Sequence, residues 1–257
     1  MPSENGRSRT KALATIEELS RALRPKMIAI SAKFAYFPEE PVAEEDLRQY
    51  LHDPIEALPV AVVELLPRIG IVLAPYLERS SPRSPVAMVK AKPVDAKLQF
   101  SAAVTGEGAA TLFFTVHDEQ VSDYHYYLYE ELSTILSHRW PEKVQKVYHG
   151  LLREELSAEV HGEVDEKSWH AKQALLRRPM SARKDGKPFR DYAARSFADT
   201  MTLYLHGICC DIDVETGPRQ LPTRYLRKRL EALKGLFPPP EGHAVFPEDL
   251  VHSHHRH

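Results

Sequence analysis

Two apolar runs on either side of a short glycine-containing loop constrain the fold of this chain most. Residues 97–104 read KLQFSAAV and residues 109–116 read AATLFFTV, with TGEG between them. In the first run apolar and polar side chains alternate, as expected of a strand with one buried face. Two such runs across a short glycine loop predict an antiparallel β-hairpin. Residues 86–92 could add a third strand to this sheet.

Most of the remaining sequence has the periodicity of helices. Apolar residues recur at helical spacing in segments 10–23, 122–138, 142–176, 189–206 and 223–235. The proline-punctuated segment 54–78 predicts two short helices, because proline ends a helix near the residue before it. Further strands are expected at 27–33 and 208–214. The predicted fold class is therefore α+β, with a small antiparallel sheet packed on a helix-rich majority.

Length and composition allow one large domain or two small ones. The chain has 257 residues, of which 43% are hydrophobic and 27% charged, and this is ordinary globular usage. We expect a disordered N-terminus over residues 1–9, a single α+β domain over 10–236 and a Pro/His-rich tail over 237–257. The loops at 79–85 and 117–122 are candidate boundaries within that domain.

Charge and cysteine content argue against several classes of protein. Lys plus Arg is 34 and Asp plus Glu is 36, so no global field favours nucleic acid or an anionic membrane. The most apolar segment, 59–76, contains Glu64, Arg68 and prolines, which suits buried core better than a membrane span. The two cysteines are adjacent and no secretory signal is visible, which predicts reduced thiols in a cytoplasmic protein.

The stretch LHGICCDIDVETGPR gathers most of the reactive side chains. Read as a strand, it places Asp211 and Asp213 on one acidic face. Carboxylates at i and i+2 can hold Mg²⁺ for phosphoryl transfer or hydrolysis. On this interpretation His206 is the acid–base candidate, and Arg219 and Arg224 bind phosphate. The simpler interpretation is an edge strand whose charged face meets solvent.

Two further interpretations use the same stretch. Its D-I-D-V sequence resembles the Asp-hydrophobic-Asp-hydrophobic element of nucleotidyltransferases, but the Gly-Ser pair that those enzymes carry upstream is replaced here by TLYLHG. The second interpretation is a zinc site, because His206, Cys209 and Cys210 offer an imidazole and two thiols. Adjacent cysteines on a strand point to opposite faces, which argues against a shared ion.

Carboxylates on the helix predicted at 142–176 are a further source of metal ligands. Glu159 and Glu163 fall in one sector of that helix together with Glu155 and His170. In the hydrolase interpretation, Glu159 or Glu163 completes the metal site of the acidic strand. The alternative is a solvated face on a long helix.

The order of hairpin, helix and acidic helix is similar to that of zinc peptidases of the zincin type. The first helix of those enzymes carries His-Glu-x-x-His, whereas residues 128–132 here read LYEEL and the motif is absent from the chain. The resemblance implies at most a relative that lacks this metal site.

A tyrosine-rich run, DYHYYLYEEL, suggests a contact surface. Tyr126 and Tyr129 lie away from the apolar stripe of their helix, and tyrosine is enriched at protein interfaces. The alternative is ordinary packing of this helix against the hairpin.

Taken together, these features favour a non-catalytic interaction or regulatory protein with a protein partner. The alternative is a hydrolase or phosphotransferase that depends on a divalent metal, the one cofactor that the residues suggest. We expect neither a membrane nor nucleic acid as a partner.

Overall fold

The computed structural model describes residues 14–118, 120–177, 186–210, 221–246 and 248–249. The strands are β1 (Ile28–Ala29), β2 (Phe34–Pro38), β3 (Arg68–Ala74), β4 (Tyr76–Glu78), β5 (Ala87–Val89), β6 (Leu98–Gln99), β7 (Ser101–Thr105) and β8 (Ala109–Thr115). The α-helices are α1 (Ile16–Leu23), α2 (Glu44–Leu47), α3 (Asp53–Glu56), α4 (Val60–Leu65), α5 (Val121–Ser137), α6 (Glu142–Ser157), α7 (Glu166–Leu176), α9 (Lys187–Cys210) and α10 (Thr223–Leu236). The short helical turns are η1 (Arg24–Lys26), η2 (Arg48–His52) and η3 (Asp95–Lys97).

The α+β prediction is confirmed, but the sheet is larger than expected and mixed in direction. Its five strands lie in the order β1-β2-β3-β8-β7. The predicted hairpin is present, since β7 pairs antiparallel with β8 and Ser101 lies opposite Phe114. However, β2 pairs parallel with β3, and β3 pairs parallel with β8. The predicted strand 27–33 is reduced to β1, which is followed by β2.

The central strand β3 falls in the second half of the segment 54–78, where the sequence predicted helices and no strand. Six of its seven residues, from Ile69 to Ala74, are buried. A strand that is covered on both faces has no polar alternation, so its run of apolar residues resembles that of a buried helix. The two short helices predicted for 54–78 are present as α3 and α4, but they end at Leu65, and Pro67 separates α4 from the strand.

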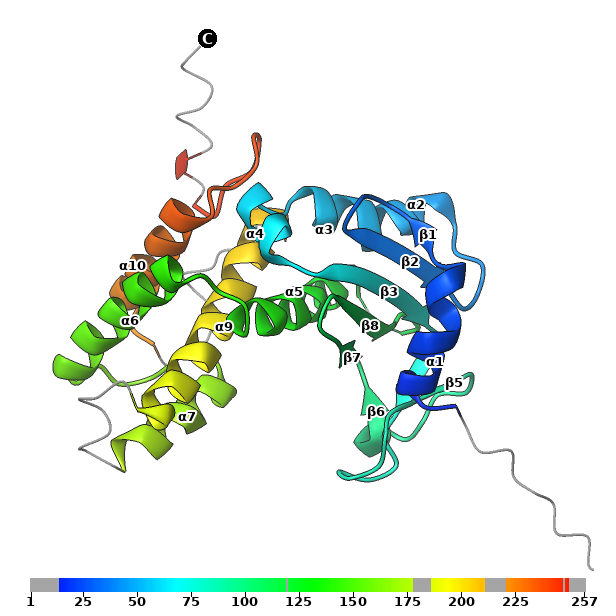
Figure 1. The fold of residues 1–257 in the computed structure, drawn as a ribbon, viewed down its shortest axis with the longest axis horizontal. Coiled ribbons are helices and arrows are strands. Elements are labelled where there is room, and N and C mark those ends of the chain that lie inside the picture. Colours follow the sequence, from blue (N-terminus) through cyan, green and yellow to red (C-terminus); the bar gives the residue numbers. More distant parts are fainter. Residues whose placement is uncertain (1–13, 119, 178–185, 211–220, 247, 250–257) are drawn as a thin grey trace, which may run out of the picture.

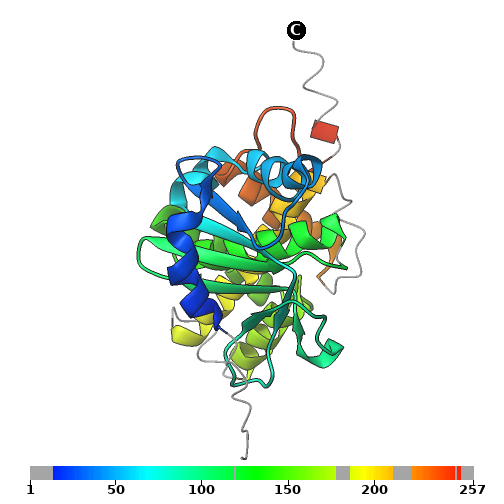
Figure 2. The ribbon, with the colours of Figure 1, turned by 90° about the vertical axis from the view of Figure 1, so that its right-hand side faces the viewer.

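The two faces of the sheet belong to two apolar clusters. Ile71, Leu112 and Phe114 pack with α5 and α9, while Val72 and Phe113 pack with α1. Figure 2 shows α1 crossing one face of the strands, with α9 (yellow) and α10 (orange) behind them. In Figure 1, the helices α6, α7, α9 and α10 gather on the side of the sheet away from α1.

The predicted third strand of the hairpin sheet lies in a separate small sheet. Here β4 pairs antiparallel with β5 on one side and with β6 on the other. The loop 79–85, a predicted boundary, therefore connects β4 to β5 within this sheet. The other predicted boundary, 117–122, leads from β8 into α5, and both of these elements bury side chains in the same core.

The long helix predicted at 142–176 is broken in two. The chain leaves α6 at Ala158, and Glu159 and Gly162 adopt left-handed backbone with φ of 50° and 84°. The next helix, α7, begins after Asp165, which caps it together with Ser168. Gly162 and the capping residue Asp165 thus end one helix and begin the next, although the helical spacing of apolar residues continues across them.

The first residues of the predicted Pro/His-rich tail, 237–246, are packed against the domain. Phe237, Val245 and Phe246 are buried in the main core beyond the end of α10. The predicted N-terminal segment 1–9 lies outside the described residues. Over the residues that the structure describes, no helix is both long and apolar enough to span a bilayer.

Candidate metal centre

The helices α5 and α9 form an antiparallel pair that brings distant side chains together. His125, near the start of α5, lies beside Cys209 and Cys210 at the end of α9. One turn further along α5, Tyr129 lies beside His206, with ring centroids 6.3 Å apart. Because the helices run in opposite directions, the first turn of one meets the last turn of the other.

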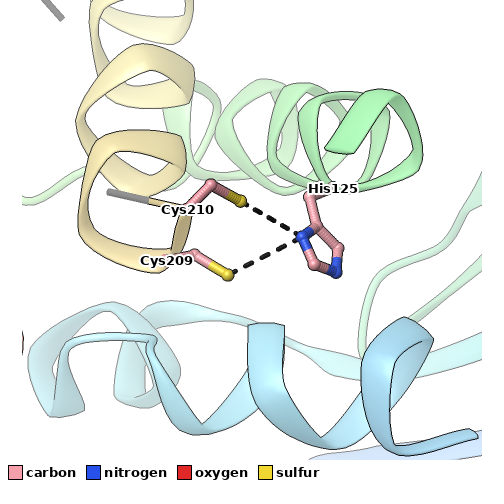
Figure 3. Close-up of side chains that lie close together, drawn as sticks. All are labelled: His125, Cys209 and Cys210. Carbon is pink, nitrogen blue, oxygen red and sulfur yellow. Dashed lines mark hydrogen bonds between the residues drawn. The ribbon is translucent and has the colours of Figure 1, made fainter. Parts of the chain in front are cut away.

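Figure 3 shows both thiols pointing from the end of α9 toward the ring of His125. The Nδ1 atom of His125 lies 3.2 Å from the Sγ atom of Cys210 and 3.8 Å from that of Cys209. One ligand atom from each of the three residues lies within 4.8 Å of the others. With metal–sulfur bonds of about 2.3 Å and metal–nitrogen bonds of about 2.0 Å, one ion between them would reach all three after small adjustments.

A backbone carbonyl fixes the orientation of the histidine ring. The Nε2 atom of His125 lies 2.7 Å from the carbonyl oxygen of Gln49, so Nε2 carries a proton and donates it. In the neutral ring, Nδ1 then holds a free lone pair that faces the two sulfurs. Gln49 belongs to η2, a single π-helical turn, and such turns occur often at functional sites. Metal-binding histidines usually have an outer partner of this kind.

The electrostatics of the cluster favour one thiolate. The hydrogen bond from Cys210 lowers the pKa of the Cys209 thiol, and His125 and Tyr129 lower it further, against the effect of burial. The same hydrogen bond and burial raise the pKa of Cys210. Burial lowers the pKa of His125, but its hydrogen bonds to Cys209 and Gln49 raise it by more. A thiolate beside a histidine is a ready ligand for a soft cation.

The histidine that the sequence selected lies one turn away from this cluster. His206 is 9% exposed, and burial, followed by the charge on His125, lowers its pKa. Its Nε2 atom is buried and has no hydrogen-bond partner among the described residues. His206 precedes Cys209 by three positions and Cys210 by four, so it shares their face of α9.

The predicted acidic strand is wrong for the part of it that the structure describes. Residues 208–210 form the last turn of α9, so both cysteines reach one side, which a strand would not allow. Asp211, Asp213 and Arg219 lie outside the described residues. The structure therefore does not describe the metal site predicted from those two aspartates. The neighbouring thiols of Cys209 and Cys210 belong to the cluster with His125.

Glu163, another predicted metal ligand, is instead held in a buried group of ion pairs. Arg229 of α10 donates to Glu163 with an N–O distance of 2.8 Å and to Glu155 at 2.9 Å. Lys172 lies 3.3 Å from Glu163, and all four side chains are at most 2% exposed. Burial raises the pKa of Glu163, but Arg229 and Lys172 lower it by more. The charges of the two cations and the two carboxylates cancel, so Glu163 is already paired and is not available as a metal ligand.

The remaining predicted site residues are scattered. Glu159 is exposed just after α6, and Arg224 is exposed with its guanidinium 4.7 Å from the ring of Tyr225. Tyr129 is fully buried and donates to the carbonyl of Pro54, so it belongs to the core instead of an exposed surface. Tyr126 is half-buried and donates to Asp165.

Sequence reasoning found both cysteines but missed His125 and Gln49. His125 lies between tyrosines in a helix with an apolar stripe, and nothing nearby in the sequence marks it as a ligand. The contact with Cys210 joins positions 85 residues apart, so no local spacing could predict it. Comparisons with protein-family models, with curated proteins and with solved structures found no match to this chain.

Proposed function

We propose that this protein is a non-catalytic regulatory protein that binds one thiophilic metal ion, with zinc the first choice, through His125, Cys209 and Cys210. The observation that carries this proposal is the convergence of both thiols on the Nδ1 nitrogen of His125. A cysteine nucleophile would need only one thiol beside the ring, so the second sulfur favours a metal. The ion would fix the end of α9 to α5 and to η2.

The class of metal follows from the ligands. Thiolate and imidazole favour zinc or another borderline or soft cation over Mg²⁺ or Ca²⁺, which prefer oxygen. The predicted hydrolase needs carboxylate ligands, and of its described candidates Glu163 is already paired with Arg229 and Lys172. It therefore has less support than the thiolate site.

The free thiols also support a location. Cys209 and Cys210 are not in a disulfide, and thiols remain reduced in the cytoplasm. We therefore place the protein in that compartment, where a metal-dependent change at the end of α9 would be available to a protein partner.

Cobalt substitution tests the proposal directly. We would use the full chain with His252, His254, His255 and His257 changed to serine, because histidines near the end of the chain can also bind cobalt. Titration with Co²⁺ should give a thiolate-to-cobalt charge-transfer band that saturates at one ion per chain, and Zn²⁺ should displace it. Elemental analysis after gel filtration should confirm one zinc.

Matched variants separate the site from unspecific binding. Cys209→Ser combined with Cys210→Ser should abolish the band, and His125→Asn should weaken binding by at least about tenfold. His161→Asn, an exposed histidine outside the cluster, is the control and should change nothing. Full metal content in the double cysteine variant would refute the proposal, and so would the absence of any thiolate band in the parent.

A further inference from the structure

A second candidate site lies where the parallel strands of the large sheet begin. A cavity of about 230 Å³ lies between η1 and the first residues of the parallel strands β2, β3 and β8. Phe34, Arg68 and Ala109, which begin those strands, all line it. No residue of the metal centre contributes to its wall.

The charge of the cavity is positive. Arg24, Lys33 and Arg68 line it, and no described Asp or Glu does. Lys33 is already engaged, because its Nζ atom donates to the carbonyls of Leu66 at 2.6 Å and Glu64 at 3.3 Å. This excess of cations is local, since the whole chain has a net charge of −2.

Two of these cations have room for a ligand. The side chains of Arg24 and Arg68 are exposed, and neither makes a hydrogen bond or ion pair with any residue in the described part of the chain. A guanidinium presents several N–H donors in one plane and matches the two oxygens of a carboxylate. Among its described residues, the cavity therefore offers two unpaired cations and no carboxylate, which is the complement of an anion.

Apart from the cations and the hydroxyls of Ser31 and Thr111, the residues of the wall are apolar. They include Met27, Phe34, Ile69 and Ala110. Gly70 allows Met27 to approach the strand closely, because a Cβ atom at Gly70 would lie 2.4 Å from the Met27 sulfur. This wall suits the hydrocarbon part of a ligand and would gain nothing from a fully hydrated ion.

We propose that this cavity binds a small organic anion, namely a carboxylate on a short apolar body. Arg24 and Arg68 would hold the carboxylate at the rim, and Met27 and Phe34 would contact the body. Pockets for drug-sized ligands measure about 300–1,000 Å³, so a cavity of 230 Å³ takes a smaller molecule. Inorganic phosphate shares the negative charge but leaves the apolar wall unused.

Binding of benzoate by the full chain, followed by NMR of the ligand or by calorimetry, tests this assignment. Benzoate should bind with a Kd on the order of 1 mM or tighter, and benzamide, the neutral analogue of the same size, at least about tenfold more weakly. Inorganic phosphate should compete poorly. If phosphate binds as well as benzoate and displaces it, the organic part of the proposal is wrong.

Variants locate the binding. Arg24→Gln combined with Arg68→Gln should weaken benzoate binding at least about tenfold. Arg21→Gln is the matched control, because Arg21 lies one turn before Arg24, is exposed and does not line the cavity. Equal affinity for benzoate and benzamide, or equal affinity of the double variant and the control, would overturn the assignment. The cysteine double variant should bind benzoate normally, so a failure of the metal proposal and a failure of this one are separable.

Discussion

His125 and Cys210 are 85 positions apart in the sequence, yet the imidazole Nδ1 and the thiol Sγ lie 3.2 Å from each other. The carbonyl of Gln49 holds the far side of the same ring. Gln49 of η2, which precedes His125 by 76 positions, thus sets the tautomer of a histidine on α5 that faces a thiol on α9. The proposed metal centre is therefore a junction of three separate segments.

The unpartnered nitrogen of His206 leads to the first prediction. A buried polar atom without a partner calls for an explanation such as a missing ion, and His206 shares a helix face with both cysteines. We expect His206 to supply the fourth ligand when metal binds, which gives a closed Cys₂His₂ set typical of structural zinc. His206→Asn should then weaken zinc binding by at least about tenfold, measured by competition with a chromophoric chelator.

His149→Asn, on α6 and outside the cluster, is the control for that experiment. Unchanged affinity in His206→Asn, together with a water molecule on the cobalt ion detected by its relaxation, would contradict the prediction. That outcome would leave a position open for substrate, as in catalytic zinc sites, and would revive the hydrolase hypothesis.

The second prediction concerns the buried guanidinium of Arg229. It is 0% exposed and pairs with Glu155 and Glu163, so Arg229→Met leaves Glu155 buried without its cation and Glu163 with Lys172 alone. We expect a loss of about 3–5 kcal/mol in the free energy of unfolding, measured with urea. Arg227→Met on the same helix removes two solvent-exposed ion pairs, with Glu231 and Glu248, and a contact with the Phe246 ring, and it should cost much less. A similar small loss in both variants would contradict the prediction.

The third prediction is a pH dependence at Asp199. Burial raises the pKa of this carboxyl to about 6 from an ordinary value of 3.8, although Ser168 donates to it. Because the folded protein binds the proton more tightly than the unfolded chain, the contribution of Asp199 to stability falls as the pH rises from about 4 to about 6. Asp199→Asn, which keeps an acceptor for Ser168, removes this loss.

The difference in unfolding free energy between Asp199→Asn and the parent should therefore depend on pH. It should be small near pH 4 and reach about 1–3 kcal/mol in favour of the variant above pH 6. Urea unfolding at several pH values measures it. A difference that stays constant between pH 4 and pH 7 would show that Asp199 ionises normally in the folded protein.

The fourth prediction concerns the contact between Gly70 and Met27. A methyl group at position 70 would lie 2.4 Å from the Met27 sulfur and 2.6 Å from its terminal carbon. The thioether can move aside, so Gly70→Ala should cost only about 1–3 kcal/mol in unfolding free energy. In a Met27→Ala background, Gly70→Ala should cost almost no further unfolding free energy, and a double-mutant cycle measures this difference. Simple additivity of the two losses would show that the residues do not compete for the same space.

Local sequence patterns predicted the elements that depend on local side-chain spacing and turn residues. The alternation around residue 100 and the glycine loop specify the hairpin of β7 and β8, which is present with the expected pairing. The stripes on α5 and α10 likewise follow from side-chain spacing. The strand β3 was missed because burial on both faces removes the alternation that identifies a strand. The break at Gly162 was missed because apolar spacing continued across it.

The candidate site was predictable only in part, for a related reason. The adjacent cysteines are visible in the sequence, but their common direction depends on a helix where a strand was expected. Their partner His125 is defined by the packing of α5 on α9, which no spacing within either helix records. The sequence suggested Glu163 as a metal ligand because its partner Arg229 lies on α10, and only the packing of α10 places the two side chains together.

The parallel pairing of β3 with β2 and β8 has a consequence for how quickly the chain can fold. Arg68 pairs with Ala109, and Phe34 pairs with Ile69, so two long segments must close before the central strand gains either neighbour. Loop closure costs entropy before those contacts return any energy. We therefore expect refolding in milliseconds to seconds instead of microseconds. The first turn of α5 and the last turn of α9 are further apart in sequence, with 85 positions between His125 and Cys210, so we expect these helices to pair after the sheet has formed.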